Sequence, residues 1–307
     1  MTLIHTLKKL TFWRVFAHFS RKFEFRFLPD SVYLKWLYRG STGRKLNLEE
    51  PKRYTEYLQW MKIYDHNPLY TTMVDKAAAK EWAAEIIGSE HIIPTLGVWE
   101  RFDDIDFGKL PNRFVLKCTH DSKSALICRD KAKFNISAAK EKLQKALTKE
   151  FFYEGRQWPY KNVPPRILAE AYMENDATGD LRDYKFFTFN GEPKIMYIAT
   201  GRGTGQIYGD FFDMDFQHLD LSIDHEMAPQ CPEKPALFEQ MKEAARLLSK
   251  GTSQVRVDFY EVNGQFYFGE MTFFHCSGFV NFHPDSWDEK FGRWIHDPTG
   301  TMGADNA

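Results

Sequence analysis

Residues 254–272 read Gln254-Val-Arg-Val-Asp-Phe-Tyr-Glu-Val-Asn-Gly-Gln-Phe-Tyr-Phe-Gly-Glu-Met-Thr272, and this stretch decides the fold of the chain. Apolar and polar residues alternate on both sides of Asn263-Gly264, a dipeptide typical of tight turns between antiparallel strands. An acid lies in an apolar, aromatic context in each half, Asp258 in the first and Glu270 in the second. The pattern therefore predicts a β-hairpin that carries one carboxylate on each strand.

The register of this hairpin decides whether the two carboxylates meet. A plain two-residue turn would pair Asp258 with Gly269 and send Glu270 to the opposite face, because side chains alternate with a period of two. A three-residue loop with Gly264 in the left-handed conformation restores the match. We therefore expect Asp258 and Glu270 to share one face as opposite or diagonal neighbours.

Two carboxylates at such close range repel each other unless a cation lies between them. Mg²⁺ held by one or two carboxylates and by nucleotide phosphates is the usual solution. The hairpin is accordingly interpreted as a metal site, and the alternative is a surface hairpin with two solvated acids.

Composition limits the classes of protein to which the chain can belong. With 307 residues, 43% of them hydrophobic, and a mean hydropathy of −0.50, it is long enough for two cores and typical of a soluble globular protein. Its net charge of −1 argues against a nucleic-acid-binding protein. The cysteines lack CxxC spacing, so we expect free thiols in a reducing cytoplasm and no zinc site; they are Cys118, Cys128, Cys231 and Cys276.

The N-terminus is basic, with six Lys or Arg and two acids in the first thirty residues. Phenylalanines recur there at helical spacing, at Phe12, Phe16, Phe19, Phe23 and Phe27. Residues 1–28 therefore predict a basic amphipathic helix that lies on the inner face of a membrane or contacts a glycan-assembly partner. The alternative is a helix that buries its phenylalanines in a core. Lys8-Lys9 interrupt the apolar run, so a signal peptide is not expected, and no segment is apolar enough to span a bilayer.

The rest of the sequence alternates between helical and extended segments, which indicates an α/β or α+β architecture. Helices are expected around 54–64, 75–87, from 137 and over 235–250, and strands over 114–118, 125–128, 167–172, 184–189 and 194–199. We expect a helical region over 1–70, two α+β subdomains over 71–175 and 176–296, and a flexible tail over 297–307.

Familiar phosphate-binding loops are missing from the sequence. It has no GxxxxGK[ST] motif, and Gly201-Arg-Gly-Thr-Gly205 is not the GxGxxG of a dinucleotide fold. A nucleotide would therefore have to be bound by cations scattered along the chain. The candidates are Lys76 at a helix start, Lys117 at the end of an apolar strand, and Arg202 in the glycine loop.

The order of these motifs resembles the ATP-grasp superfamily of carboxylate-amine ligases, and within it the TupA-like (teichuronopeptide biosynthesis) branch. The motifs are Asp75-Lys76, Phe114-Val-Leu-Lys117, Ile167-Leu-Ala-Glu170, Arg256-Val-Asp258 and Glu270. The resemblance extends over roughly residues 30–295. It implies an ATP-grasp fold in which two α+β subdomains grip ATP behind an N-terminal helical region.

The resemblance also implies roles for individual residues. Lys76 and Lys117 would contact ATP phosphates, and Glu170 with the backbone of Ala171 and Tyr172 would meet the adenine edge. Further nucleotide contacts would come from Asp183 near the ribose, where Glu174 competes for the role, and from Lys185.

The metal and catalytic residues follow from the same resemblance. Asp258, Glu270 and Thr272 would hold Mg²⁺, as one ion or two, although Thr272 stands where the superfamily usually places an asparagine. Arg256 would stabilise the anionic intermediate, with Lys117 and Arg202 as further catalytic residues. The loop after Lys117 lacks the glycines of a flexible phosphate lid and contains an acid, Asp121.

The implied reaction is ATP-dependent amide formation through an acyl phosphate. The implied substrates are a uronic acid of a capsular or other cell-surface polysaccharide and an amino acid or amine. One alternative is a glycosyltransferase, because Asp104-Ile-Asp106 and Asp213-Met-Asp215 mimic a DxD motif. Another is a catalytically weak ATP-binding assembly subunit. Thiol chemistry at His275-Cys276 is not expected, because neighbours on a strand point to opposite faces.

Overall fold

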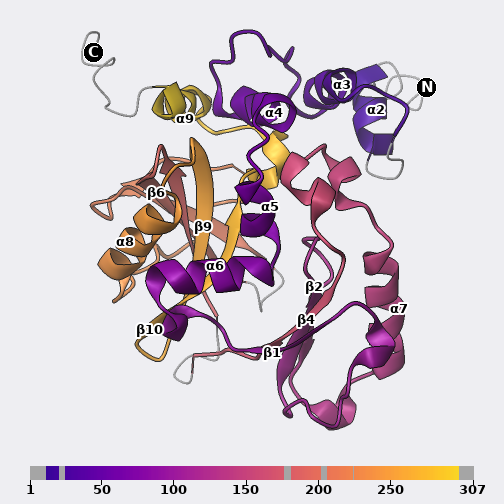
Figure 1. Ribbon diagram of the computed structural model, residues 1–307. Coiled ribbons are helices and arrows are strands. Elements are labelled where there is room, and N and C mark those ends of the chain that lie inside the picture. The colour runs from indigo at the N-terminus through magenta and orange to yellow at the C-terminus, as the bar shows by residue number, and fades with distance from the viewer. Residues whose placement is uncertain (1–11, 21–24, 176–180, 202–205, 224, 297–307) are drawn as a thin grey trace, which may run out of the picture.

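Two antiparallel sheets and a group of N-terminal helices make up the structure (Figure 1). The computed structural model of the protein describes residues 12–20, 25–175, 181–201, 206–223 and 225–296. Phe23, Lys8-Lys9, Arg202 and the tail predicted for 297–307 lie outside the described residues. Both sheets are accompanied by helices, so the predicted α+β class is confirmed.

The smaller sheet has four strands in the order β1-β4-β2-β3. Their bounds are Thr95–Trp99, Phe114–Cys118, Leu126–Cys128 and Ile167–Ala171 for β1 to β4 in chain order. Helix α7 (Ile136–Leu147) begins at the Asn135 cap and packs Ala139 and Leu143 against the inward side chains of β2. Phe114, Leu116 and Cys118 alternate with the less buried Val115 and Lys117, as expected for a sheet with one face in a core.

The larger sheet has six strands in the order β10-β9-β5-β6-β7-β8. Their bounds are Asp183–Phe189, Glu192–Thr200, Tyr208–Phe212, His218–Leu219, Gln254–Val262 and Gln265–Thr272 for β5 to β10. Helix α8 (Phe238–Leu248) packs against β5, β6 and β9, while α5 (Leu69–Val74) and α6 (Ala78–Ile87) contact β10. Every residue of β5 is buried, so this central strand is covered on both faces.

The β9–β10 hairpin confirms that Asp258 pairs with Glu270, but this register does not come from the predicted three-residue loop. Val262 pairs with Gln265, and Asn263 and Gly264 both have positive φ, 52° and 80°, so the turn has two residues and not three. The register shifts instead between Phe268 and Glu270, where Gly269 forms a bulge, and Glu270 then faces Asp258.

Close packing explains why the bulge residue is a glycine. A Cβ atom on Gly269 would lie 3.0 Å from the Asp258 carbonyl oxygen and 3.0 Å from the Tyr260 ring, which is closer than side chains normally approach. The register of the two acids therefore depends on a residue in the second strand. The alternation pattern alone did not reveal this.

The N-terminal helices lie beyond the ends of both sheets, and α9 (Ser286–His296) lies beside them at the top of Figure 1. Helix α2 (Phe12–Ser20) packs on α3 (Asp30–Thr42), with Phe16 buried against Tyr33 and Trp36. Phe12, Phe19 and Phe27 are exposed to 57%, 42% and 80%. One member of the phenylalanine stripe therefore enters a core, as the alternative predicted, and three are exposed. Among the described residues, no helix has the length and apolar character needed to cross a membrane.

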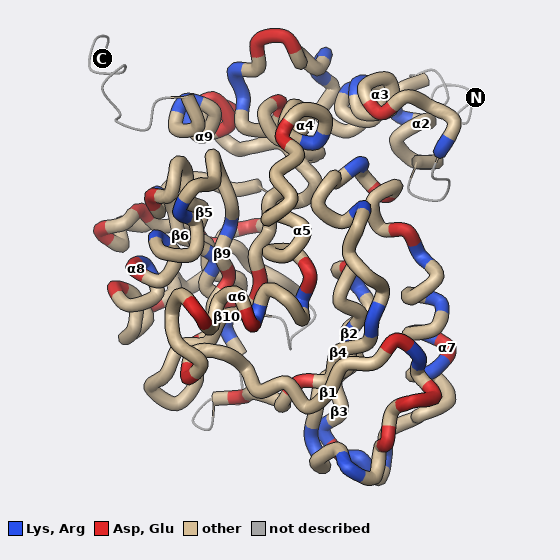
Figure 2. Tube along the Cα trace, in the orientation of Figure 1, with Lys and Arg blue, Asp and Glu red and all other residues tan. Residues whose placement is uncertain are grey.

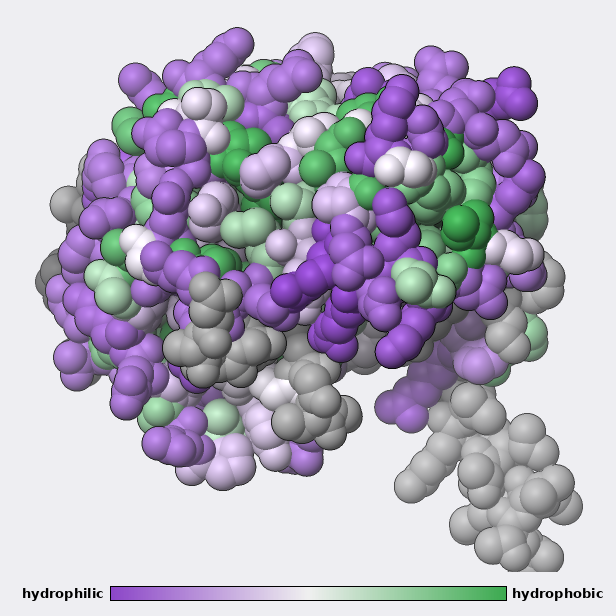
Figure 3. Space-filling view, turned by 90° about the horizontal axis from the view of Figure 1, so that it is seen from below, coloured by the Kyte–Doolittle hydropathy of each residue, from purple (hydrophilic) through white to green (hydrophobic). Residues whose placement is uncertain are grey.

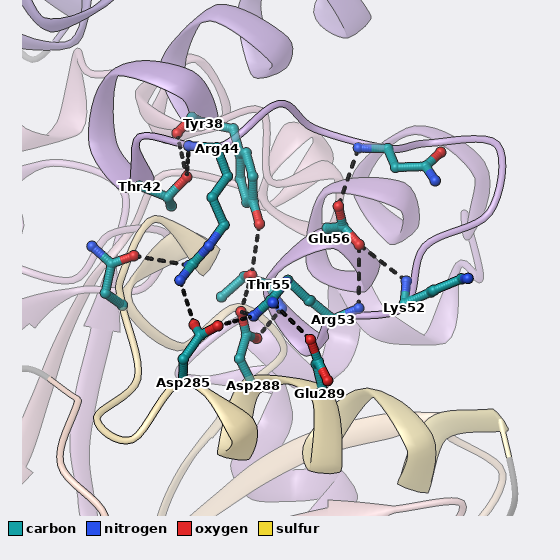
Figure 4. Close-up of polar contacts among 12 residues, drawn as sticks. Tyr38, Thr42, Arg44, Lys52, Arg53, Thr55, Glu56, Asp285, Asp288 and Glu289 are labelled. Carbon is teal, nitrogen blue, oxygen red and sulfur yellow. Dashed lines mark hydrogen bonds and ion pairs between the residues drawn. The ribbon is translucent and has the colours of Figure 1, made fainter.

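A polar network fastens α9 to α4 (Tyr54–Tyr64), as Figure 4 shows. Arg53 pairs with Asp285 at 2.9 Å and with Glu289 at 2.7 Å. Beneath these exposed pairs, Asp288 is fully buried and accepts hydrogen bonds from the backbone N–H and the hydroxyl of Thr55, at 2.9 and 2.8 Å. The end of the described chain is thereby tied to the helix that precedes both sheets.

The buried carboxyl of Asp288 predicts a pH-dependent stability. Burial raises its pKa to about 6, against roughly 3.9 in the unfolded chain. Between about pH 4 and pH 6 the folded state binds the extra proton, so this group lowers stability as pH rises, by about 1.4 kcal/mol per pH unit at most. Asp288→Asn keeps an acceptor for the Thr55 N–H and should remove this slope from urea-unfolding free energies. Asp285→Asn, at a half-exposed site, is the control; equal slopes in wild type and Asp288→Asn would contradict the assignment.

Candidate functional site

Three adjacent strands bring charged side chains into one row. Lys185 on β5 pairs with Asp258 on β9, which pairs in turn with Glu270 on β10. Arg256, two residues before Asp258, lies on the same face and pairs with Thr272. In Figure 2 the charged positions of β9, β10 and α6 lie together near the middle of the molecule. The structure therefore brings together all of the predicted metal residues and Arg256.

The oxygens predicted to bind metal converge on one cationic nitrogen. Nη2 of Arg256 lies 2.7 Å from Oδ2 of Asp258, 3.0 Å from Oγ1 of Thr272 and 3.6 Å from Oε1 of Glu270. Two carboxylates and a hydroxyl that surround a positive charge suit a hard cation such as Mg²⁺ in ligand type and in charge. No group of three or more His, Cys, Asp or Glu suited to a metal occurs among the described residues. Nucleotide phosphates would have to supply the remaining ligands.

Asp258 is the electrostatic centre of the row. It is buried, and it receives two bonds from Arg256 and one from Lys185, whose Nζ lies 2.6 Å from Oδ2. Burial alone would raise the pKa of Asp258, but the charges of Arg256 and Lys185 outweigh it and hold the pKa below its usual value. The same Lys185 nitrogen lies 3.4 Å from Oδ2 of Asp183, which is also buried. Asp258 is therefore ionised at neutral pH.

A second cluster surrounds Glu170 on the small sheet. One carboxylate oxygen lies 2.5 Å from Nζ of Lys117 on β2, and the other lies 2.5 Å from Nζ of Lys80 on α6. Burial would raise the pKa of Glu170, but the two lysines lower it. Lys80 was not among the residues predicted from the sequence. Its position four residues after Lys76, on a helical segment, was a usable signal, because residues with this spacing share one helix face.

Lys76 connects the two clusters. Its Nζ donates to the carbonyl oxygen of Asp121 in the loop after β2, and it lies 3.9 Å from Oε2 of Glu270. Burial and the nearby charge of Lys117 lower the pKa of Lys76, partly offset by Glu270. The preceding residue, Asp75, accepts hydrogen bonds from the first N–H groups of the α6 segment and so fixes where Lys76 points.

The residues expected around adenine, Glu170 to Tyr172, lie at the end of β4 and just beyond it. The side chain of Glu170 faces the lysines, and the N–H of Ala171 donates to the carbonyl of Pro94 at 3.0 Å. Tyr172 stacks under Arg113, with the guanidinium 4.3 Å from the ring centre, and lines a cavity of about 310 Å³. Of the two ribose candidates, Asp183 lies in the buried row, whereas Glu174 pairs with Arg113 at this cavity.

The acid in the loop after Lys117 is turned inward. Asp121 is buried, and its carboxylate accepts a hydrogen bond from the hydroxyl of Ser124, which in turn accepts one from the N–H of Cys118. The carboxylate thereby organises the loop.

His275 and Cys276 do not lie on a strand, so the predicted reason for excluding thiol chemistry there is wrong. The hydrogen bonds of His275 exclude it instead. The two residues lie in a 3₁₀ turn (His275–Gly278), where Cys276 has a φ of 46° and its sulfur lies 3.6 Å from Nε2 of His275. Nδ1 of His275 accepts a hydrogen bond from Nη1 of Arg256 at 2.7 Å, so the ring proton sits on Nε2. A ring with this tautomer cannot take a proton from the thiol. His275 instead positions Arg256, a role the sequence analysis missed.

A cavity of about 560 Å³ opens onto the charged row. Arg256, Glu270 and Thr272 form one part of its wall. The rest is aromatic or hydroxyl-bearing for the most part and includes Tyr33, Phe151, Tyr160, Phe274 and Phe279, with Ser20, Ser41, Ser122 and Ser277. Tyr33 and Ser41 belong to α3, so the N-terminal helical region forms part of the wall.

The two acids of the row differ in burial and should differ in their effect on stability. Asp258→Asn leaves Arg256 and Lys185 buried without their common counter-charge and is expected to lower the unfolding free energy by about 3 kcal/mol. Glu270, with 40% of its side chain exposed, tolerates Glu270→Gln within about 0.5 kcal/mol. Urea denaturation of the two variants beside wild type measures the difference; equal losses would contradict the central position of Asp258.

The chain was compared with known families, curated proteins and solved structures. The family described as TupA-like ATPgrasp matches residues 56–296. No protein of curated function matches the sequence.

Similar solved structures share little sequence with the chain. D-cycloserine synthetase DcsG is 17% identical, with a TM-score of 0.42, over 78% of this chain and 77% of its own. D-alanine–D-alanine ligase from Helicobacter pylori is 14% identical, with a TM-score of 0.40, over 80% and 68%. The Bacillus anthracis ligase is 16% identical, with a TM-score of 0.38, over 71% of this chain, which spans only 58% of that protein. The family match carries the assignment and confirms the prediction: the chain belongs to the TupA-like ATP-grasp family.

Proposed function

We propose that the protein forms an amide bond between a carboxylate and an amine at the expense of ATP, through an acyl phosphate. The observation that carries this proposal is the meeting of two clusters of charged side chains, one on each sheet. Asp258 and Glu270 converge with Arg256 on the large sheet, and Lys76 connects this row to the lysines around Glu170 on the small sheet.

The lysine cluster suits a polyphosphate. Lys80 and Lys117 pair with a single carboxylate, Glu170, and Lys76, which lies 3.9 Å from Glu270, adds a third cation nearby. Phosphoryl transfer is catalysed mainly by positioning and by neutralising charge, which is what such a cluster provides. Mg²⁺ held by Asp258, Glu270 and Thr272 would supply further neutralisation of the phosphates.

Arg256 suits the carboxylate substrate. It is fixed by Asp258 and His275 and reaches the wall of the 560 Å³ cavity. A guanidinium recognises a carboxylate strongly, and it can stabilise the oxyanion that develops when an amine attacks an activated carboxyl.

The cavity supports a sugar as the carrier of that carboxylate. Aromatic rings such as Tyr160 and Phe274 offer faces to a sugar ring, and hydroxyls such as those of Ser122 and Ser277 offer partners to its hydroxyl groups. We therefore propose a uronic acid of a surface polysaccharide as the acceptor, and an amino acid or simple amine as the second substrate. A cytoplasmic location follows from the need for ATP and agrees with the free cysteines of the described residues.

The two DxD sequences do not favour the glycosyltransferase alternative. Asp213 accepts hydrogen bonds from the N–H groups of Asp215 and Gln217, and Asp106 accepts one from the N–H of Gly108. Both motifs therefore build turns, as short acidic side chains commonly do.

A thermal-shift comparison separates these two functions. Mg-ATP should raise the midpoint of thermal unfolding by binding only the folded state, and nucleotide sugars should leave it unchanged. Stabilisation by nucleotide sugars alone would favour the glycosyltransferase.

ADP release tests the ligase proposal directly. The wild-type chain should release ADP in the presence of Mg-ATP, D-glucuronate or D-galacturonate, and an amine, and hydroxylamine should trap the activated carboxyl as a hydroxamate. Glu270→Gln should lower the rate at least about 100-fold, because a metal contributes several kcal/mol to stabilisation of the transition state. Glu81→Gln, at an exposed position on α6, is the matched control. ATP binding without ADP release, with any acceptor in the matrix, would instead indicate an ATP-binding assembly subunit.

A further inference from the structure

Helix α2 has an apolar face that packs on α3 and beside it an apolar stripe that is largely exposed. Phe16 and Ser20 are buried, and Phe16 lies 5.3 Å from the Trp36 ring of α3. Phe12, Val15 and Phe19, which follow the spacing i, i+3, i+7, are exposed to 57%, 37% and 42%. Phe12 also touches α3, with its ring edge-on to the Trp36 ring at 5.2 Å, yet it remains 57% exposed. The stripe therefore presents apolar surface beyond what packing on α3 covers.

The outward stripe has basic neighbours. On a helical wheel, Arg14 and His18 lie next to Val15 on the exposed side, and both are exposed. Phe27, in the loop that leads to α3, is 80% exposed. By contrast, the face of the molecule seen from below in Figure 3 is mostly hydrophilic, with hydrophobic residues scattered among hydrophilic ones.

A groove of about 750 Å³ lies beside α2. Its apolar lining consists of Trp13, Trp36, Leu46 and Leu48, and three cations, Lys35, Arg39 and Lys45, also line it, with Asn47 and Glu49. None of the three cations forms an ion pair with another residue in the part of the chain that the structure describes. Cations placed beside an apolar floor match an amphiphile with a phosphate head.

We propose that this end of the molecule docks on a membrane surface rich in anionic phospholipid. Lys35, Arg39 and Lys45 hold the lipid phosphate in the groove, and the α2 stripe of Phe12, Val15 and Phe19 enters the region of the acyl chains. The first thirty residues contain six basic residues and two acids, and this excess of positive charge favours attraction to an anionic membrane. This inference goes beyond the ligase reaction and is independent of it.

Co-sedimentation of the full-length protein with vesicles tests the docking surface. The protein should bind vesicles of phosphatidylcholine and phosphatidylglycerol at a ratio of about 7 to 3, should not bind phosphatidylcholine alone, and should dissociate at high salt. Lys35→Gln/Arg39→Gln should weaken binding about 30-fold, since each basic residue near an anionic surface contributes roughly a factor of five. Val15→Ser/Phe19→Ser should weaken it without any change in charge.

A matched control separates a defined surface from general electrostatic attraction. Lys109→Gln/Lys133→Gln also removes two positive charges, from side chains 86% and 87% exposed on the small subdomain, and should bind as wild type does. Thermal midpoints of all variants establish that they are folded.

Three results would overturn the proposal. The first is a wild-type protein that does not bind the anionic vesicles. The second is an equal loss of binding in the Lys109/Lys133 control. The third is binding abolished by millimolar inorganic phosphate and unaffected by Val15→Ser/Phe19→Ser, which would assign the groove to a soluble phosphate compound.

Discussion

The buried interaction of Arg256, Asp258 and Lys185 is the constraint on which the rest of the site depends. It joins strands β5 and β9, and the side chains involved are almost fully removed from water. Charges in such a place persist only when they compensate one another with good geometry, and Asp258 achieves this with bonds of 2.6, 2.7 and 2.6 Å. Glu270, Thr272 and His275 are arranged around the guanidinium of Arg256. These residues thus form one electrostatic unit supported by the strands of the large sheet.

A second constraint comes from the order of elements along the chain. Lys80 of helix α6 pairs with Glu170 on the small sheet. Lys76, which comes just before this helix, lies near Glu270 on the large sheet. The same segment therefore serves both clusters, while α4 and α9 hold the helical region in place behind it (Figure 4). The charged clusters of the two sheets are consequently linked through one short segment of the chain.

Sequence patterns predicted those parts of the fold and site that depend on local periodicity. Alternation around Asn263-Gly264 predicted the hairpin, and a side-chain period of two predicted that Arg256 and Asp258 share a face. Contacts between other segments of the chain produce no periodic pattern in the sequence. The pairing of Glu170 with Lys80 and the support of Arg256 by His275 depend on how separate elements pack together. The inward turn of Asp121 depends instead on a local hydrogen bond from Ser124, and the loop has no periodic pattern that would reveal it. The position of the register shift was also missed, because a glycine inside a strand has several possible structural roles.

The bulge at Gly269 bears on how relatives of this chain should be aligned. It absorbs exactly one residue, since the strands are paired regularly from the turn up to Phe268 and again from Glu270 onward. A homologous hairpin that lacks this residue would continue in regular pairing and would still place its glutamate opposite the aspartate. A one-residue gap at this column therefore does not signify a lost carboxylate pair. A gap or insertion of one residue between the bulge and Thr272 would move the positions beyond it to the other face of the sheet.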